Sequence, residues 1–469
     1  LALLTAAAFG VACGDDAPAS RAPIEVPQTY TFESRLLPGV SSVAYTGQTK
    51  RHALILAMKD YIGGLTDQSF PDPEPGEVAE ALRFFHEFAT AGGAGEDPIG
   101  IDPGVAPALQ TTWADLGSLT TLTEKMPEND GHELGGLLGY GDGSMEPEQV
   151  LFDLFARLDA LIVARAGGNV PVDPSGAEIP QPYVDGTGVD YLQVIQKYLT
   201  GAIALSQAAD DYLDDDVPGK GLLGDNTELV EGEAYTTLEH LWDEGFGYFG
   251  APRNYGDYSD DEAAAAGGRD DFQGANDANG DGFIDLESEY VFGHAQNAAK
   301  RDRGSAASAP TDFSQDAFDA FLAGRTLIVN ADGALDDAQL DELRAHRDQA
   351  LLAWERAIAA TAVHYVNDTL QDMGRFGTPE YDFADHAKHW SELYGFALAL
   401  QFDVRHRPIS DQDLLELYTL IGSAPVLPNA DPAAIDDYRA GLVRVKSLLG
   451  DAYGFAPENL GDEQGQGGW

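Results

Sequence analysis

EHLWDEGFGYFG, residues 239–250, lies near the middle of the chain and groups a histidine, three carboxylates and four aromatic side chains. If this stretch is a helix, His240 and Glu244 lie four residues apart on one face, with Asp243 beside them. Side chains at this spacing can be two ligands of one cation, or they can form a buried histidine–glutamate hydrogen bond. The sequence leaves both alternatives open.

Apolar side chains recur at helical spacing on both sides of this stretch. The pattern predicts helices over residues 50–62, 77–90, 145–166, 189–213, 286–300, 336–369, 383–402, 411–421 and 434–449. Only residues 29–46 have β character, and they predict an extended segment or a small hairpin. We therefore expect a mainly α fold of one or two helical bundles with long loops and a short extended N-terminal segment.

The first residues have the composition of an export signal. Residues 1–12 (LALLTAAAFGVA) resemble the end of a secretory signal peptide and are too short to span a bilayer. Val11-Ala12-Cys13 followed by Gly14 resembles the cleavage box of bacterial lipoproteins, with Cys13 as the lipidated residue. Ordinary signal-peptidase cleavage is the alternative.

The sequence predicts that the chain has four parts. After the signal remnant, residues 13–28 are rich in proline and alanine and form a tether, and residues 29–455 form the folded domain. The glycine-rich residues 456–469 are expected to be a disordered tail. The prediction is a lipoprotein of the bacterial outer membrane, facing the periplasm or the surface, that contacts the membrane only through its lipid anchor.

The charge of the chain is strongly negative, with 79 acidic and 27 basic residues among 469 and a net charge of −52. Such a surface repels nucleic acid and attracts cations, so a nucleic-acid partner is not expected. A solvated acidic surface and a cation-gathering role both fit this composition. One cysteine excludes an internal disulfide and a CxxC zinc site.

The most specific ion signal is DANGDGFID at residues 277–285, which matches the D-x-N-x-D-G-x-I-D half of an EF-hand calcium loop. Position 12 of such a loop is normally glutamate but is Ser288 here, and Glu289 next to it is a shifted ligand candidate. The predicted calcium ligands are Asp277, Asn279, Asp281, Phe283 through its carbonyl, Asp285 and Glu289. An acidic turn without an ion is the alternative.

A second candidate site is built from histidines. His364 lies in a long predicted helix, and His389 and Glu392 lie three residues apart in the next one. The predicted ligands of a transition-metal site are His240, Asp243, Glu244, His364, His389 and Glu392, if these segments converge. Hydrogen-bonded histidines inside helix contacts are the alternative for each of them.

Several stretches resemble known proteins. The central stretch resembles the region around the G-x-H-x-x-E motif of imelysin-like proteins, and more closely an uncharacterised family of bacterial lipoproteins related to them. The shared stretches are residues 45–49, 239–250, 292–302, 360–365 and 389–392. The resemblance implies two helical bundles, a cell-envelope location and a role in iron acquisition or metallopeptidase activity. The motif histidine would be His240, and its acidic partner Asp243 or Glu244.

Three functional hypotheses follow. The first is an envelope lipoprotein that binds a metal ion (iron or zinc) or a metal-bearing ligand, with a structural calcium and envelope transport partners. The second is a metal-dependent peptidase in which Glu244 or Glu392 activates water. The third is a structural envelope protein without a site. The sequence does not decide the oligomeric state.

Overall fold

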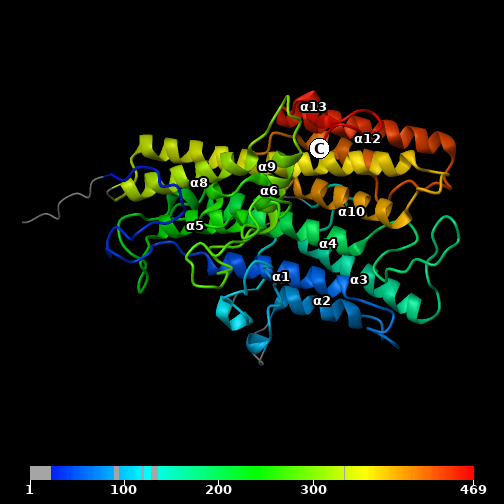
Figure 1. Ribbon diagram of the computed structural model, residues 1–469, viewed down its shortest axis with the longest axis horizontal. Coiled ribbons are helices and arrows are strands. Elements are labelled where there is room, and N and C mark those ends of the chain that lie inside the picture. Colours follow the sequence, from blue (N-terminus) through cyan, green and yellow to red (C-terminus); the bar gives the residue numbers. More distant parts are fainter. Residues whose placement is uncertain (1–22, 89–93, 118–120, 128–135, 332) are drawn as a thin grey trace, which may run out of the picture.

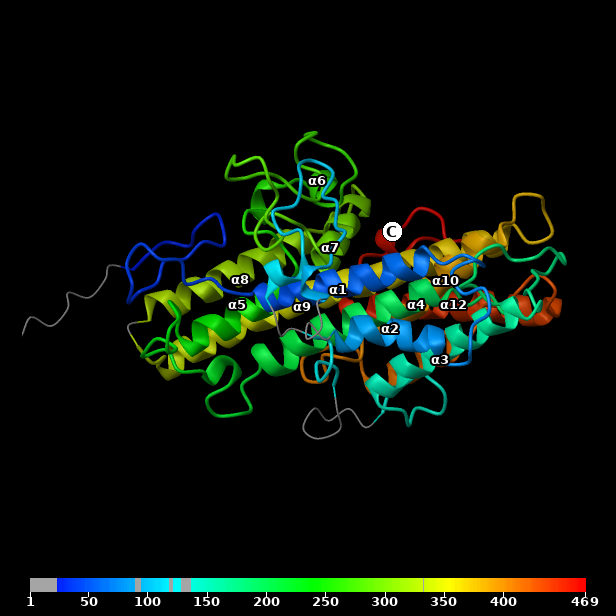
Figure 2. The same ribbon diagram turned by 90° about the horizontal axis from the view of Figure 1, so that it is seen from below.

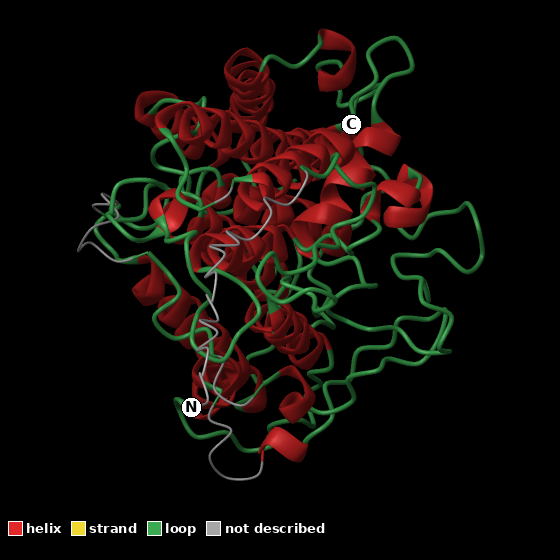
Figure 3. Ribbon diagram, turned by 90° about the vertical axis from the view of Figure 1, so that its left-hand side faces the viewer, coloured by secondary structure: helices red, strands yellow, loops and turns green. Residues whose placement is uncertain are grey.

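The computed structural model of the protein describes residues 23–469 except 89–93, 118–120, 128–135 and 332. Over these residues it consists of helices and loops, and its only β structure is a set of isolated bridges (Figure 3). The prediction of a mainly α fold with helical bundles is therefore confirmed. The signal remnant, Cys13 and the start of the tether lie outside the described residues.

The α-helices agree with most of the predicted ranges. They are α1 (Thr46–Gly63), α2 (Glu77–Glu87), α3 (Pro147–Ala166), α4 (Tyr191–Leu199), α5 (Thr237–Phe249), α6 (Asp260–Ala263), α7 (Gly293–Gly304), α8 (Phe313–Asn330), α9 (Asp337–Gly374), α10 (Phe383–Ala399), α11 (Asp411–Ile421), α12 (Pro432–Tyr453) and α13 (Pro457–Leu460). Within the described residues, no helix is long and apolar enough to cross a membrane.

Helix α9 is the longest element and organises the fold. Its 38 residues extend about 57 Å. The Asp336 side chain accepts the backbone N–H of Gln339 and caps its start. Figure 1 shows α8 beside the left part of α9, and α10 and α12 beside its right part, in agreement with the helix contacts. The bundles are thus joined through one shared helix.

The N-terminal helices cover the other side of this framework. Helix α2 packs on α3, and α1 packs on both α4 and α5 (Figure 2). Helix α4 in turn packs on α10. Residues 29–46 form the small hairpin-like turn that the sequence predicts, with an isolated antiparallel bridge between Glu33 and Ser41.

Two predicted helices differ from the structure, and one long helix was not predicted. The helix expected over 189–213 begins as α4 and continues in the wider turns of π-helices over Thr200–Leu205 and Gln207–Tyr212. The helix expected from residue 286 begins at Gly293, because residues 286–292 are still part of the acidic loop region. Helix α8 is not among the predicted helices.

The expected disordered tail over residues 456–469 is wrong. The segment contains helix α13, and Trp469 is only 5% exposed, packed against Phe313 and Phe455. The buried Lys446 donates hydrogen bonds to the carbonyls of Gly461 and Asp462. Glycine-rich composition predicts flexibility, but specific partners outside the segment fix its backbone here.

Gly324 on α8 permits the closest helix contact near the central stretch, because a Cβ there would lie 2.1 Å from the Trp242 ring of α5. Gly324→Ala is expected to lower the free energy of unfolding by about 3 kcal/mol, since the two helices must separate. Urea unfolding measures this. Gly374→Ala is the control, because a Cβ there meets no atom within 4 Å; equal stabilities of the two variants would contradict the prediction.

Candidate metal-binding site

Helix α5 carries the central stretch and begins at a reciprocal cap. The Thr236 hydroxyl accepts the N–H of Glu239, and the Glu239 carboxylate accepts the N–H of Thr236. Gly250 ends the helix with φ of 83°, a left-handed conformation that favours glycine. The central stretch is thus a helix, and it carries carboxylates on two different faces.

The inner face of α5 holds a buried ion pair. Arg325 Nε donates to Asp243 Oδ1 over 2.8 Å, and Arg325 Nη1 donates to Glu239 Oε1 over 3.1 Å. The Tyr30 hydroxyl also donates to Asp243 Oδ1, over 2.8 Å. Burial raises the pKa of Asp243, and the charge of Arg325 opposes this rise. Asp243, one of the predicted metal ligands, thus belongs to a buried ion pair in which Arg325 and Tyr30 occupy its carboxylate.

The outer face of α5 holds the predicted histidine–glutamate pair. His240 Nε2 lies 3.6 Å from Glu244 Oε2, and the side chains are 31% and 16% exposed. The other ring nitrogen, His240 Nδ1, lies 3.1 Å from the carbonyl oxygen of Ala44, and the imidazole stacks on Tyr235. Gln48 Nε2 donates to Glu244 Oε1 over 2.8 Å. This face offers two ligand types but no third acidic or histidine partner among the described residues.

A second histidine group lies between α9 and α10. His389 Nδ1 is 2.7 Å from Asp372 Oδ2, a carboxylate that is only 3% exposed. His389 Nε2 is 3.9 Å from Asp368 Oδ2, and His364 Nε2 is 3.4 Å from the same oxygen. When Asp372 holds Nδ1–H, the lone pair of His389 Nε2 is left for an ion. Two imidazoles thus face one carboxylate oxygen.

The protonation of this group suits metal binding. Burial, with the nearby charge of Arg301, lowers the pKa of His364 to about 3, so this imidazole is neutral at physiological pH. Burial alone would lower the pKa of His389, but the hydrogen bond and charge of Asp372 raise it overall. Burial raises the pKa of Asp368. A metal ion would compete with protons on His389 and Asp368 but not on His364.

Distances in the group match part of a metal site. A tetrahedral ion with bonds of about 2.1 Å separates its ligand atoms by about 3.4 Å. The separation of His364 Nε2 and Asp368 Oδ2 has this value, whereas the 3.9 Å from His389 Nε2 to Asp368 Oδ2 would have to shorten. The two Nε2 atoms lie more than 4.8 Å apart, so the histidines would also have to approach each other to share an ion. The donor set of two imidazoles and one carboxylate fits a transition metal or zinc.

Glu392 lies at the edge of this group on α10. Its Oε1 atom is 3.4 Å from Lys197 Nζ. Its Oε2 atom is buried and accepts no hydrogen bond from the described residues. The negative charge of Glu392 also raises the pKa of His389. Burial, followed by the charge of Glu392 and a side-chain hydrogen bond with it, raises the pKa of Tyr365, so Glu392 is a carboxylate shared by Lys197 and Tyr365 at the edge of the group.

The predicted convergence of all six metal ligands is not found. Among the described residues, one group has at least three carboxylate or histidine ligand atoms within 4.8 Å of one another. None of the six predicted ligands belongs to it. Helix α5 packs against α1 and α8, and His240 faces the segment before α1, while His389 faces the C-terminal part of α9. The predicted set therefore divides into a pair on α5 and a separate group between α9 and α10.

The loop over residues 277–285 folds around its own carboxylates. Asp277 accepts the backbone N–H groups of Gly280 and Gly282 over 2.7 and 2.8 Å. Glu289 turns back into the loop, and its two oxygens accept the N–H groups of Ala278 and Asp285 over 2.9 Å each. The oxygen-rich donor set fits calcium, but its carboxylates form no group within 4.8 Å.

The other predicted calcium ligands lie in the same turn. Asn279 and Asp281 accept the N–H groups of Asp281 and Phe283, respectively. Asp285 Oδ1 accepts hydrogen bonds from Gln110 Nε2 and from the N–H of Glu287. These contacts show how the sequence forms the turn.

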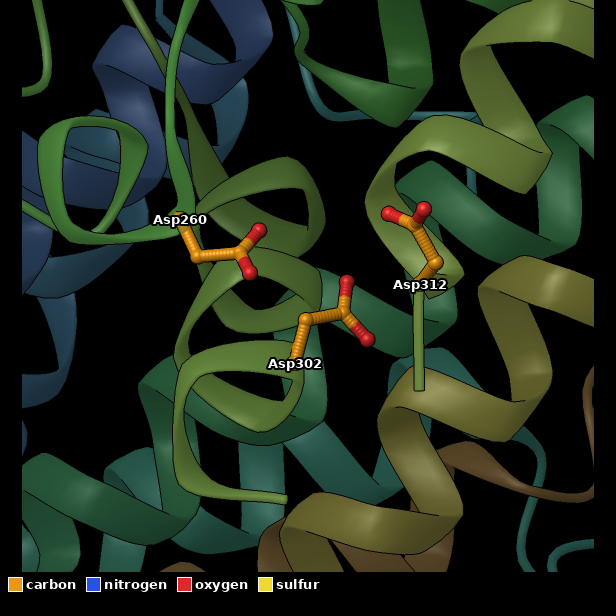
Figure 4. A group of neighbouring side chains, drawn as sticks. All are labelled: Asp260, Asp302 and Asp312. Carbon is orange, nitrogen blue, oxygen red and sulfur yellow. The ribbon is translucent and has the colours of Figure 1, made fainter. Parts of the chain in front are cut away.

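A third acidic group was not predicted. Asp260, Asp302 and Asp312 offer carboxylate oxygens that all lie within 4.8 Å of one another (Figure 4). Burial, followed by the charges of Asp302 and Asp312, raises the pKa of Asp260 to about 6. Asp302 also accepts the N–H groups of Phe313 and Ser314 at the start of α8. This contact gives Asp302 a structural role that needs no ion.

Sequence reasoning identified the two histidines of the α9–α10 group but not its aspartates. Asp368 and Asp372 follow His364 at intervals of four residues, so all three lie along one side of α9. This spacing is a signal that could have found them. The aspartates of Figure 4 come from three separate segments, and no local pattern joins them.

Comparison with known proteins gives one family match. A family model described as a domain of unknown function (DUF4856) matches residues 164–267, which include the central stretch. No curated protein and no solved structure matches the chain. The relation to an uncharacterised family is thus supported over this segment, and the match carries no imelysin assignment.

Proposed function

We propose that this protein binds a divalent transition-metal ion through His364, Asp368 and His389. The observation that carries the proposal is the pair of imidazole Nε2 atoms that face Asp368 Oδ2, at 3.4 and 3.9 Å. Asp372 supports it by holding His389 Nδ1, in the manner of the carboxylates that orient metal-binding histidines. Glu392 supplies a further carboxylate oxygen at the edge of the site.

Mixed imidazole and carboxylate ligands suit iron and zinc. The resemblance to imelysin-like proteins favours iron, and with it a role in iron acquisition. The hydrolase alternative has less support, because Lys197 and Gln48 contact the two carboxylates proposed to activate water, Glu392 and Glu244. Metal binding without catalysis is therefore the function that we propose.

Titration of metal-free protein with Zn²⁺ and with Fe²⁺ under anaerobic conditions tests this site. His389→Ala is expected to abolish high-affinity binding because it removes a ligand. Asp372→Ala is expected to weaken binding by about 10–100-fold, because it removes only the group that orients His389. In the unsubstituted protein, affinity should fall as the pH falls through the raised pKa of His389.

Two histidine variants are controls for this titration. His406 also contacts an aspartate through Nδ1, which lies 2.9 Å from Asp403 Oδ1, but it belongs to the loop between α10 and α11. His406→Ala should leave binding unchanged. Loss of binding in His240→Ala together with normal binding in His389→Ala would move the site to α5 and contradict the proposal.

We also propose that residues 277–289 bind a structural calcium ion. The support is the match to an EF-hand loop and the return of Glu289 to the place of the missing glutamate. Asp260, Asp302 and Asp312 are the competing oxygen site. The two sites share no residue, so single substitutions separate them.

Calcium chelation by EGTA is expected to lower the melting temperature by several degrees, because an ion bound only to the folded state stabilises it. Asp277→Asn should abolish this response, because it removes a carboxylate of the loop. The response should persist in Asp260→Asn, which changes the competing site. An unchanged melting temperature after chelation would exclude a structural calcium ion, and loss of the response only in Asp260→Asn would assign it to the other site.

The envelope location is proposed on the sequence of residues 1–28, with Cys13 as the lipid attachment point. The acidic composition and the metal site are compatible with such a location. Transport partners in the envelope would then receive or deliver the bound metal.

A further inference from the structure

A cavity of about 700 Å³ lies between α3, α4, α10 and α11 and is lined on one side by the loop over residues 138–143. Helices α3, α4 and α10 lie together in the right part of Figure 1. Pockets for small organic ligands have volumes of about 300–1,000 Å³. We call this feature the α10–α11 cavity. It is separate from the metal site, because Trp390 lines it whereas the preceding residue, His389, faces α9.

The wall of the α10–α11 cavity is held by contacts within the protein. The N–H of Leu138 donates to Gln401 Oε1 over 2.9 Å, and the Tyr394 hydroxyl donates to the carbonyl of Gly139 over 2.6 Å. Gly139 has φ of 78°, and a Cβ there would lie 2.4 Å from the ring of Tyr418. The loop therefore lies directly on α10 and α11, and the cavity is formed before any ligand binds.

Five aromatic side chains line the cavity, namely Tyr140, Tyr191, Trp390, Tyr394 and Tyr418. Each of them uses its one polar hydrogen inside the protein. The acceptors are Asp153, Asp185, the carbonyls of Gly139 and Ala397, and the Tyr438 hydroxyl. These side chains therefore offer a ligand ring faces and oxygen lone pairs, but no hydrogen-bond donor.

The charge at the cavity is mainly negative. Asp142 and Asp185 line it, and Arg157, the arginine that lines it, is paired with Asp153 over 2.6 Å. The hydrogen bonds to Asp142 and Asp185 come from groups that are not basic, in Ser144, Thr187, Val189 and Tyr191. Because the whole chain also has a net charge of −52, the cavity attracts cations and repels anions.

We propose that the α10–α11 cavity binds an organic cation, with an ammonium or guanidinium group on an apolar body. Its N–H groups meet the oxygens of Asp142 and Asp185, which also balance its charge. Aromatic ring faces attract such a group, and the Arg157 guanidinium already lies 5.5 Å from the centre of the Tyr140 ring. A neutral sugar fits the cavity less well, because the tyrosine donors are already used.

This inference goes beyond the proposed function, because the cavity shares no residue with the proposed metal and calcium sites. Calorimetric titration of the whole protein at physiological salt tests it. The probes are phenethylamine and agmatine, with 2-phenylethanol as the neutral analogue of phenethylamine and maltose as a neutral sugar. At least one of the two cations is expected to bind about tenfold or more tightly than 2-phenylethanol, because only a cation gains the charge-assisted contacts.

Asp185→Asn should weaken binding of that cation by about tenfold, because the charge is lost while the side chain keeps its size. Asp173→Asn is the matched control. Asp173 Oδ1 accepts the N–H and hydroxyl of Ser175, just as Asp185 Oδ1 accepts those of Thr187, but Asp173 does not line the cavity. This variant should bind the cation like the unsubstituted protein.

Leu415 provides a second test that does not depend on the folding of Asp185→Asn. It lines the cavity and is 54% exposed, so polar substitutions there leave the core intact. Leu415→Lys should bind the cation more weakly than Leu415→Gln, because only the lysine adds repulsion. Absence of binding of both cations, binding of maltose alone, or equal affinity for phenethylamine and 2-phenylethanol without agmatine binding would overturn the inference. Equal affinities in folded Asp185→Asn and Asp173→Asn, or in Leu415→Lys and Leu415→Gln, would do the same.

Discussion

Asp243→Ala is expected to lower the free energy of unfolding by about 3–5 kcal/mol. The substitution removes the partner of Arg325 Nε and the acceptor of the Tyr30 hydroxyl. Arg325 and Asp243 are both fully buried, so water cannot replace the lost contacts without opening the fold. The cost arises mainly from the guanidinium that is left with too little negative charge around it.

The same cluster connects three distant parts of the chain. Tyr30 stacks on Phe246 of α5 with ring centroids 3.8 Å apart, and Arg325 Nη2 donates to Ser42 Oγ. Loss of Asp243 should therefore loosen the N-terminal segment first. Hydrogen exchange of the amides near Tyr30 should become faster in the variant, in addition to the change in global stability measured by urea unfolding.

Glu244→Ala is the matched control for this prediction. Glu244 is the next residue of the same helix, but it lies on the outer face, and the contact that it accepts is a hydrogen bond from Gln48. Its loss should cost about 1 kcal/mol. A double variant, Asp243→Leu with Arg325→Met, should recover much of the stability, because it removes both buried charges together. Similar losses in Asp243→Ala and Glu244→Ala would contradict the assigned roles.

These two carboxylates show what the sequence of α5 could and could not predict. The helix itself follows from its spacing and its cap, and the His240–Glu244 pair was predicted correctly as neighbours. However, Glu239 and Asp243 form a second pair with the same four-residue spacing. The choice between the faces depends on Arg325, which is 82 residues away from Asp243. No local pattern contains that information.

The group between α9 and α10 shows the same limit of prediction from sequence, because it depends on how two helices pack. Long periodic helices were predicted well, and His364 and His389, both predicted as metal ligands, each face Asp368 Oδ2. Their meeting requires the register between two helices, which the packing of α9 and α10 fixes and their separate sequences do not.

Deletion of residues 456–469 is expected to lower the free energy of unfolding by about 5 kcal/mol or more. Loss of a buried tryptophan alone costs about 3–5 kcal/mol, and Trp469 is such a residue. The deletion also removes the carbonyl acceptors of Lys446. Urea unfolding of the shortened and full chains measures the effect.

The deletion should also alter the metal site. Trp469 Nε1 donates to the carbonyl of Arg301 over 2.9 Å, and Asn367 Nδ2 donates to the carbonyl of Trp469 over 2.9 Å. The backbone of Trp469 also contacts His364. Removal of the segment would therefore admit water to His364 and Arg301, which weakens every electrostatic interaction there. Metal affinity should fall even under conditions in which the shortened chain is still folded.

Trp469→Ala and Gln464→Ala show whether the loss of stability on deletion comes from the packing of Trp469 or from the shorter chain. Trp469→Ala should reproduce most of the loss in stability, because it removes the buried ring and keeps the backbone. Gln464 is exposed, and its backbone N–H, which the substitution keeps, donates to Asp462, so Gln464→Ala should change stability by less than about 0.5 kcal/mol. A disordered segment would give the opposite pattern, in which deletion and both substitutions leave stability and metal binding unchanged. The hydrogen bonds of Trp469 to α7 and α9 are the physical reason to expect otherwise.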